Sequence, residues 1–359
     1  MYSFSFRWAR HLLHALLLVI SGAALSAPTY RPEVIAAPYF DLGCWWYDTA
    51  ITMNNHGESL LWSRQCGTPD MRTDLYSSTG ELLKVVGSFS GRYGSRDVRI
   101  INDRGSLAGN DSTGFPHLVF VDPAKGEDFY ISGFVEGDSG GMLSDAFAYG
   151  ASDAGHIAGQ ALGALDGRLR GYVWHRGVMQ EIGTLGGKSS TAYGVNSHGV
   201  AVGTADVHGS THHAFVFRKG KIADLGTLGG KNSVARAIND RGQITGFADK
   251  ANGYEHAFIF ADGQMKALPT PQDTVMSFPE SINESGHVVG EYHLPDYSVI
   301  PFLFDGSVVH RIQDLLSPED QLLWTVTRAV AINDRGWILA DALRAGDTLS
   351  TVVLLKPMP

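Results

Sequence analysis

The chain has 359 residues and a formal net charge of −9 at pH 7, from 28 Lys and Arg against 37 Asp and Glu. Binding to nucleic acid needs clustered cations that neutralise phosphates, and this acidic sequence lacks them, so we exclude a nucleic-acid partner. The two cysteines, Cys44 and Cys66, are too few for a cysteine-ligated metal cluster.

The N-terminus has the pattern of a secretory signal peptide. Arg7 and Arg10 precede an apolar run over residues 12–20, and small residues follow through Ala27. The apolar run is too short to span a bilayer, and no later stretch is apolar for long enough. We expect residues 1–27 to be a signal peptide, with Ala24 and Ser26 as alternative last residues before the cleavage point.

Export sets the expectations for the mature chain. We expect residues 28–359 to form one domain of a secreted or periplasmic monomer without a membrane span. An oxidising compartment favours a disulfide between Cys44 and Cys66, which would close a loop and stabilise the fold by about 3 kcal/mol. The alternative is that the two cysteines are separate small core residues.

A unit of roughly 45 residues recurs about seven times and predicts a repeat architecture. The anchor of each unit is a short apolar run that ends in Asn, three residues before a Gly. Successive anchors lie 48, 50, 44, 43, 44 and 50 positions apart. The anchors are Asn54/Gly57, Asn102/Gly105, Ser152/Gly155, Asn196/Gly199, Asn239/Gly242, Asn283/Gly286 and Asn333/Gly336.

Four short strands are predicted within each unit. In the fifth unit they cover Ala235–Ile238, Gln243–Phe247, His256–Phe260 and Gln264–Leu268, and the segment from Asn239 to Gly242 has the residues that a type I turn prefers. Antiparallel four-stranded units at this period are typical of propeller blades, whereas a β-helix has shorter coils and helical repeats need a 3.6-residue period. We predict an all-β, seven-bladed β-propeller. Its units cover residues 47–94, 95–143, 144–190, 191–233, 234–276, 277–324 and 325–357.

The last unit lacks a fourth strand, because the chain ends soon after its third strand, Thr351–Leu355. The segment Tyr39–Gly43 matches Ile222–Gly226, the fourth strand of unit four. We therefore expect Tyr39–Gly43 to complete the seventh blade, which would close the ring and remove its exposed edges.

Several strings in units four and five resemble the HAF repeats of bacterial extracellular proteins. They are the Gly-Thr-Leu-Gly-Gly-Lys segments that begin at Gly183 and Gly226, the Ile-Asn-Asp-Arg-Gly turns, and the His-Ala-Phe segments that begin at His213 and His256. The other units carry degenerate versions. The resemblance implies secretion and a repeat fold, and it supplies neither an activity nor catalytic residues.

Propeller topology places the tight turns on one face, which we call the turn face, and the longer connections on the opposite face, the loop face. Variable loops on a rigid scaffold usually carry function, so we predict a ligand site on the loop face. The candidates are aromatic residues suited to stacking, histidines, and the Lys and Ser residues that recur where the chain crosses between units. They are Trp45, Trp46, Phe115, Tyr254, Tyr297, His213, His256, His293, Lys188, Ser190, Lys231 and Ser233.

Each candidate also has a structural reading. Single aromatic residues more often pack in a core or rim, His213 and His256 occupy equivalent positions that suit a structural role on the third strand, and Ser190 and Ser233 could satisfy backbone groups. The Asn-Asp-x-Gly turns offer too few oxygen ligands for calcium, and no spacing forces the histidines to converge on a metal. We expect no metal and no cofactor.

The segment Gly137–Gly141 resembles the nucleophile segment of trypsin-like proteases, but no partner His and acid accompany it. The sequence thus favours a secreted, non-enzymatic protein that binds a protein or glycan partner through the loop face. The alternative is a hydrolase or lyase of extracellular polysaccharides whose active site lies at the channel mouth.

Overall fold

The computed structural model describes residues 27–41, 44–65, 71–89, 96–111, 117–122, 127–131, 146–162, 168–209 and 211–358. The expected signal peptide therefore falls almost wholly outside the described residues, as do Phe115 and Cys66. The disulfide between Cys44 and Cys66 stays a prediction for that reason.

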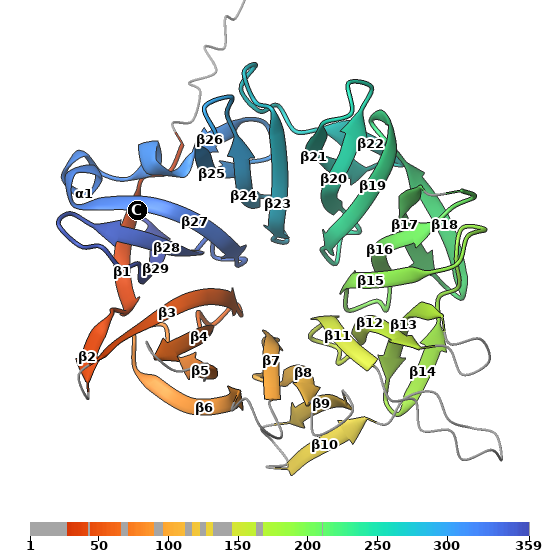
Figure 1. Cartoon of the computed structure of the whole chain (residues 1–359), viewed down its shortest axis with the longest axis horizontal. Coiled ribbons are helices and arrows are strands. Elements are labelled where there is room, and N and C mark those ends of the chain that lie inside the picture. The colour runs from red at the N-terminus through yellow and green to blue at the C-terminus, as the bar shows by residue number, and fades with distance from the viewer. Residues whose placement is uncertain are drawn as a thin grey trace, which may run out of the picture.

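The strands form antiparallel sheets arranged around a central opening, which confirms an all-β propeller of antiparallel blades (Figure 1). Six of the sheets have four strands, and one, near the N-terminus, has five. Sheet 1 contains β2 (Tyr39–Asp41), β3 (Cys44–Met53), β4 (Ser59–Gln65), β5 (Met71–Tyr76) and β6 (Leu82–Phe89). Sheet 2 contains β7 (Arg96–Ile101), β8 (Leu107–Asp111), β9 (His117–Asp122) and β10 (Glu127–Ile131).

The middle sheets follow the repeat most closely. Sheet 3 contains β11 (Ala146–Ala151), β12 (Ile157–Leu162), β13 (Leu169–His175) and β14 (Val178–Glu181). Sheet 4 contains β15 (Ser190–Val195), β16 (Ala201–Asp206), β17 (His212–Arg218) and β18 (Lys221–Gly226). Sheet 5 contains β19 (Gly229–Ile238), β20 (Ile244–Lys250), β21 (Glu255–Ala261) and β22 (Gln264–Ala267), close to the four strands predicted for unit five.

The last sheets carry the only helical segments of the described chain. Sheet 6 contains β23 (Met276–Ile282), β24 (Val288–His293), β25 (Val299–Phe304) and β26 (Val309–Arg311). The 3-10 helix η1 (Ile312–Leu315) and helix α1 (Pro318–Leu323) then lead to β27 (Trp324–Ile332), β28 (Ile338–Arg344) and β29 (Thr351–Pro357) of sheet 7. Helix α1 begins after Ser317, whose side chain accepts a hydrogen bond from the Asp320 N–H, as an N-cap does.

The strand that completes sheet 7 comes from the N-terminal segment, but from different residues than the sequence suggested. Strand β1 (Tyr30–Ala36) pairs antiparallel with β29, with Val34 opposite Val353. Tyr39–Asp41 instead pairs with β3 and widens sheet 1 to five strands, so the prediction for Tyr39–Gly43 was wrong.

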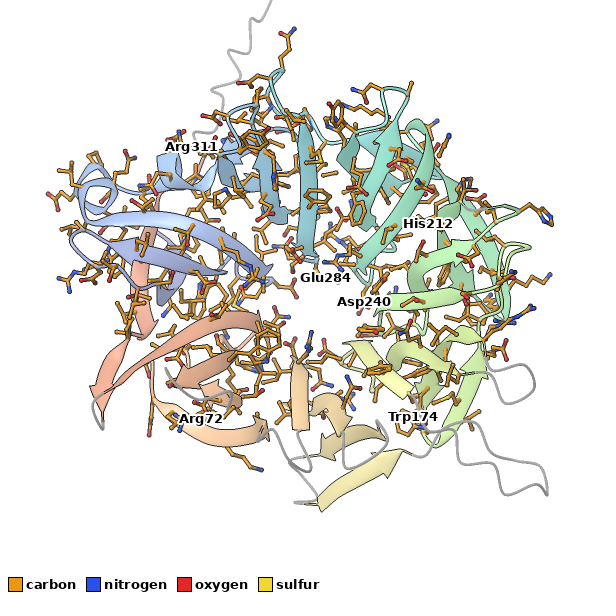
Figure 2. All side chains as sticks on the ribbon, in the orientation of Figure 1. Arg72, Trp174, His212, Asp240, Glu284 and Arg311 are labelled. Atoms are coloured by element: carbon orange, nitrogen blue, oxygen red, sulfur yellow. The ribbon has the colours of Figure 1, made fainter. Side chains whose placement is uncertain are left out.

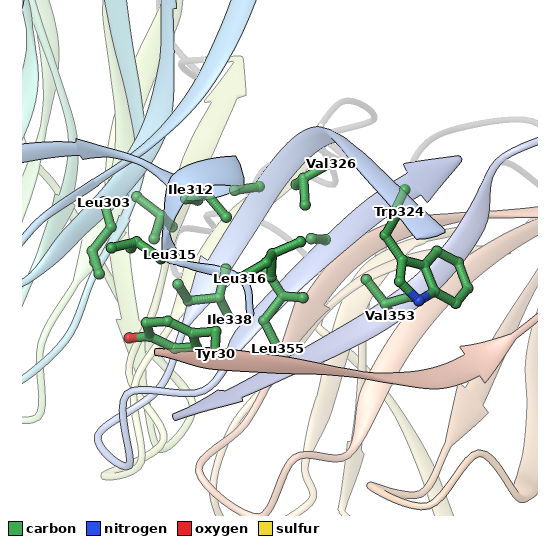
Figure 3. Close-up of a cluster of buried hydrophobic side chains, with 14 of the residues drawn as sticks. Tyr30, Leu303, Ile312, Leu315, Leu316, Trp324, Val326, Ile338, Val353 and Leu355 are labelled. Atoms are coloured by element: carbon green, nitrogen blue, oxygen red, sulfur yellow. The ribbon is translucent and has the colours of Figure 1, made fainter. Parts of the chain in front are cut away.

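Burial explains why β1 takes this place. Tyr30 is 2% exposed and Ile35 is 3% exposed. Tyr30 lies in an apolar cluster with Ile312, Leu315 and residues of sheet 7 (Figure 3). The likeness of Tyr39–Gly43 to a fourth strand reflects local composition, whereas the longer β1 places apolar side chains in the space that sheet 7 leaves.

A repeated pair of residues shapes the core between sheets. In sheets 3 to 6 a buried aromatic residue of the third strand stands opposite a glycine of the second strand, as Phe215 stands opposite Gly203. A Cβ atom on Gly203 would lie 1.9 Å from the carbonyl oxygen of Thr191, on the inner strand of the same sheet. Glycine is needed at Gly203 because the backbone of the inner strand crowds the second strand there. Sheets 1 and 7, whose inner strands also bulge, have Leu61 and Ala340 at the equivalent position.

The position of β1 can be tested by truncating one buried side chain. We expect Ile35→Ala to lower the free energy of unfolding by about 2–4 kcal/mol, because it leaves a cavity between β1 and sheet 7. The control is Val34→Ala on the same strand, where Val34 is 45% exposed. Chemical denaturation measures both variants, and equal losses would contradict the pairing of β1 in sheet 7.

Candidate binding site in the central channel

The inner strands β3, β7, β11, β15, β19, β23 and β27 surround the central channel and end at the anchor turns (Figure 1). Each anchor Asn bonds within its own turn and with the next sheet. In sheet 4, Oδ1 of Asn196 accepts the N–H groups of His198 and Val200, and its Nδ2 donates to the carbonyl of Asn239, 3.1 Å away. The same link to the next sheet recurs from Asn54, Asn102, Asn239, Asn283 and Asn333.

A second row of hydrogen bonds runs beside the first. At six of the seven anchors the next residue presents a side-chain oxygen that accepts the backbone N–H of its counterpart in the preceding sheet. Oδ1 of Asp240 accepts a hydrogen bond from the N–H of Ser197 at 2.7 Å. Oδ1 of Asn55 accepts one from the N–H of Asp334, also at 2.7 Å, and this bond links sheet 7 to sheet 1. The remaining links end on Asp103, Asp153, Glu284 and Asp334. We call the two rows together the clasp.

The clasp is interrupted between sheets 3 and 4. Ser152 stands where six other anchors have Asn, so it has no amide to donate, and Ser197 stands where most units have a carboxylate. Of the hydrogen bonds among the described anchor residues, none joins Ser152 or Asp153 to Asn196 or Ser197. Two substitutions in neighbouring repeats thus affect the same joint, which is held by other contacts, such as the hydroxyl of Ser190 on the Gly171 N–H.

The clasp surrounds a cavity of about 290 Å³ at the turn end of the channel. Five carboxylates line it, and Asp240 and Glu284 lie beside the opening (Figure 2). The acidic ring comprises Asp103, Asp153, Asp240, Glu284 and Asp334. Burial, and then the neighbouring carboxylates, raise the pKa of Asp153 and that of Glu284. Because each carboxylate already accepts a backbone N–H, the ring has a structural role.

A different set of side chains lies further along the channel wall. In every inner strand the residue three positions before the anchor is the extra residue of a β-bulge, where the pairing register shifts. Bulges re-aim side chains. We call these bulge residues the channel belt: Ile51, Arg99, Tyr149, Tyr193, Arg236, Glu280 and Val330. Ile51 and Val330 pack in apolar clusters between sheets, so the polar and aromatic members are those of sheets 2 to 6.

The belt is continuous over sheets 3 to 6. The rings of Tyr149 and Tyr193 have centroids 5.5 Å apart, the guanidinium of Arg236 lies 5.7 Å from the Tyr193 ring, and Nη2 of Arg236 lies 3.5 Å from Oε2 of Glu280. Arg99 lies 4.7 Å above the ring of Trp62. Aromatic faces alternate here with guanidinium groups, an arrangement that binds planar and polar ligands well.

An aromatic group adjoins the belt at sheets 5 and 6. The Phe278 ring packs edge-on against Phe247, at 5.3 Å, and against His293, at 5.5 Å. His293 Nε2 in turn lies 3.1 Å from Oε1 of Glu291. Burial raises the pKa of the Glu280 carboxyl, although the positive charges of Arg236 and Arg328 lower it.

A buried polar trio lies at the joint between sheets 7 and 1. Oγ of Ser63 contacts Oδ1 of Asp48 and lies 2.6 Å from Oδ2 of Asp74. Nε of Arg72 donates a second hydrogen bond to Oδ2 of Asp74, at 2.7 Å. Asp74 occupies the strand position where sheets 3 to 6 have a buried aromatic residue, and its Oδ1 has no hydrogen-bond partner. One hydroxyl proton cannot serve two carboxylates at once, so this arrangement favours the protonated form of the Asp48 carboxyl.

The protonation of Asp48 follows from its surroundings. Burial, with the charge of Asp74, raises the pKa of Asp48 to about 6, although the Ser63 hydrogen bond and Arg72 oppose the rise. The trio lies on the same face of sheet 1 as Ala50 and Leu61, which pack against sheet 7. Ionisation of Asp48 therefore places an extra charge inside the joint that closes the ring.

The structure disperses the other residues predicted for the loop-face site. Ser190 and Ser233 are buried, and each hydroxyl accepts a backbone N–H from the preceding sheet, that of Gly171 at 2.9 Å and that of Ala214 at 2.7 Å. Lys188 is exposed on the connection between sheets 3 and 4, and Lys231 is exposed near the start of β19. Trp45 and Trp46 lie on β3, where they pair with Phe40 and Tyr39.

The histidines and tyrosines differ among themselves. Nδ1 of His213 lies 2.7 Å from Oδ2 of Asp224. His256 is the counterpart of His213 in sheet 5, where Ala267 takes the position of Asp224. Nδ1 of the buried His256 therefore has no hydrogen-bond partner. Tyr254 is 49% exposed and Tyr297 is 92% exposed, on separate loops. His293 packs against Phe278, beside the belt.

Sequence reasoning missed the belt itself. Its members are three positions before each anchor, and Arg, Tyr and Glu there are unusual among the small and aliphatic residues of the inner strands. Alternation of period two cannot reveal a bulge, so these side chains could not be assigned to the channel wall from the pattern alone.

The described part of the chain contains no group of three or more His, Cys, Asp or Glu residues placed to hold a metal ion. It also contains no helix that is both long and apolar enough to pass through a membrane.

No protein-family model matches the chain, and no curated protein matches it. The HAF-repeat resemblance therefore stays a prediction.

Several solved structures are similar to the chain in fold. One comes from an analysis of two prolyl endopeptidases (TM-score 0.56, 11% identity, 87% of this chain and 50% of that chain). Another is an oligogalacturonate lyase in complex with manganese (TM-score 0.54, 10% identity, 92% of this chain and 99% of that chain). A third is the acylaminoacyl peptidase of Pyrococcus horikoshii (TM-score 0.51, 11% identity, 87% of this chain and 51% of that chain). The chain spans about half the length of the two peptidases, and identities this low show the fold alone.

The interrupted clasp predicts that the joint between sheets 3 and 4 can be strengthened. We expect the double variant Ser152→Asn/Ser197→Asp to raise the free energy of unfolding by about 1–3 kcal/mol, because it supplies one hydrogen bond to each row. Ser152→Ala offers no amide and should give no gain. Thermal unfolding measures the variants, and a double variant no more stable than the original chain would contradict the repair.

The buried trio predicts a dependence of stability on pH. The folded-state pKa of Asp48 is raised to about 6, so its stabilising contribution is full at low pH and is lost as the pH rises through about 6. At pH 8 we expect Asp48→Asn to be more stable than the original chain by about 1–3 kcal/mol, and at pH 4 to show no advantage. The exposed turn residue Asp262 provides the control, Asp262→Asn. A constant difference across the pH range would rule out ionisation as the cause.

Proposed function

We propose that the protein is a non-enzymatic, exported propeller that binds a glycan in its central channel, entered from the loop face. The observation that carries the proposal is the channel belt, where the half-exposed rings of Tyr149 and Tyr193 lie next to Arg236. Sugar rings stack on aromatic faces while their hydroxyls bond charged and amide groups, so this wall suits a saccharide.

The assignment of the carboxylates supports binding over catalysis. The acidic ring consists of groups from different sheets, as an active site at the channel mouth would need. Its oxygens, however, accept the backbone N–H groups that hold the sheets together. A catalytic acid or base must be able to exchange its proton with a substrate, and these groups are committed to the clasp.

The loop-face residues keep a place in this proposal. Tyr254, Tyr297, Lys188 and Lys231 are exposed on the side from which a ligand would approach, and we propose them as the rim of the entrance. A protein partner would use that rim alone, without the belt. His293 adjoins the belt and would contact a ligand that reaches Phe278.

A polysaccharide hydrolase or lyase is the second candidate, and one observation favours it. Burial, and to a lesser extent the charge of Glu291, raises the pKa of Glu280 on the channel wall. A carboxyl group with a raised pKa near a second carboxylate is the arrangement that glycoside hydrolysis uses. Release of soluble product from a bound polysaccharide would establish this function and overturn the binding-only proposal.

The belt can be tested with variants that keep the fold. In a screen of immobilised neutral and acidic polysaccharides, we expect the mature chain to be retained on at least one of them. Tyr149→Ala/Tyr193→Ala should weaken that binding about tenfold or more, because each lost stacking contact contributes about 0.5–1.5 kcal/mol. Tyr149→Phe/Tyr193→Phe keeps the rings and should retain most of the affinity.

The matched control is Tyr297→Ala, which removes a fully exposed ring from the rim. A loss of binding for Tyr297→Ala with none for the belt variant would place the ligand on the rim and contradict the channel site. Circular dichroism and thermal unfolding show whether each variant keeps the native fold.

A further inference from the structure

The side chains along the channel form layers of different character. The acidic ring follows the anchors directly, and a layer of apolar side chains precedes them by one residue: Met53, Ile101, Ala151, Val195, Ile238, Ile282 and Ile332. The channel belt lies two residues further back on each inner strand. The belt and the acidic ring are four residues apart, which at the rise of a strand is about 13 Å.

The two ends of this series differ in charge. The acidic ring carries five carboxylates, whereas the belt carries Arg99 and Arg236 against Glu280, a net charge of 2 − 1 = +1. Arg328, two residues before the belt position of sheet 7, lies 3.5 Å from Oδ2 of Asp341, so its charge is already paired.

Arg236 is the arginine best placed to receive a ligand. Its side chain is 39% exposed, and its ion pair with Glu280 uses one terminal nitrogen at 3.5 Å. An exposed pair of that length contributes little, so a ligand can compete for the guanidinium. The group also lies over the Tyr193 ring, 5.7 Å from its centroid. A sugar ring that stacks on Tyr149 or Tyr193 would thus bring an acidic substituent within reach of Arg236.

We propose that the ligand of the channel is an acidic saccharide whose carboxylate or sulfate group pairs with Arg236, and that it enters from the loop face. This inference rests on the proposed function and names the chemical class of its ligand. A planar guanidinium binds carboxylate and sulfate oxygens in a bidentate manner, which a neutral sugar cannot match. The acidic ring repels the same groups at the turn end, so the ligand approaches from the opposite side.

The test uses saccharides in matched acidic and neutral forms. The probes are a polyuronate oligosaccharide with its methyl ester, and dextran sulfate with dextran, each titrated into the full mature chain. We expect the acidic member of at least one pair to bind about tenfold more tightly than its neutral partner at low salt, with the difference shrinking as ionic strength rises. The two pairs distinguish carboxylate from sulfate.

The variant Arg236→Gln locates the contact. It should remove about tenfold of the affinity for the acidic probe and lower any affinity for the neutral probe by much less. Arg311→Gln is the matched control, because Arg311 lies on the outer side of sheet 6 (Figure 2). A second variant, Arg236→Lys, keeps the charge and should recover part of the loss but not all of it.

The outcomes separate this inference from the proposed function. Equal binding of acidic and neutral probes, with loss in the tyrosine variants, would overturn the acidic-saccharide inference and leave the glycan-binding proposal standing. Binding of acidic probes that Arg236→Gln does not change, or that Arg311→Gln weakens equally, would also overturn it. Binding of no saccharide of either kind would reject both.

Discussion

The ring of sheets depends on hydrogen bonds between the turns at the inner edge of neighbouring sheets. Each sheet by itself is a small antiparallel unit with apolar faces, and hydrophobic packing between sheets is not directional. The hydrogen bonds of the clasp are directional, and they fix how each sheet is oriented against the next. An anchor amide reaches the next carbonyl, and a side-chain oxygen reaches back to the preceding N–H, as Asn333 and Asn55 do where the last sheet meets the first. The anchor motif is thus both a turn and the fastener between units.

The same strands that form the clasp also build the candidate site. A bulge three residues before each anchor bends the inner strand. Over sheets 3 to 6 the bulge residue also contacts its counterpart in the next sheet. The repeat fixes the position of these seven side chains but not their identity. The belt side chains can therefore vary while the scaffold stays the same.

The sequence predicted the parts of the fold that are local and repeated. Residue pattern and turn chemistry predict the anchors and the strand order within unit five. They also allow for the role of Ser190 and Ser233, whose hydroxyls accept backbone N–H groups. It did not predict which N-terminal segment completes sheet 7, because Tyr39–Gly43 and Tyr30–Ala36 both have strand-forming residues. Only the apolar space beside Ile312 and Leu355 decides between them.

The candidate site was harder to predict for a related reason. Exposed loops attract attention because they vary, but Tyr254 and Tyr297 lie on separate loops that the fold does not bring together. The belt residues are far apart in the sequence and become neighbours only through the bulge and the ring. Asp48 and Asp74 likewise look like ordinary polar residues of strands until pairing with Ser63 places them in a buried joint.

The most direct test of this account is a crystal structure of the mature chain with a saccharide that it retains. The account predicts a sugar ring against Tyr149 or Tyr193, with an acidic group at the guanidinium of Arg236, inside the central channel. A saccharide bound only at the rim near Tyr254 or Tyr297, with the belt untouched, would contradict it.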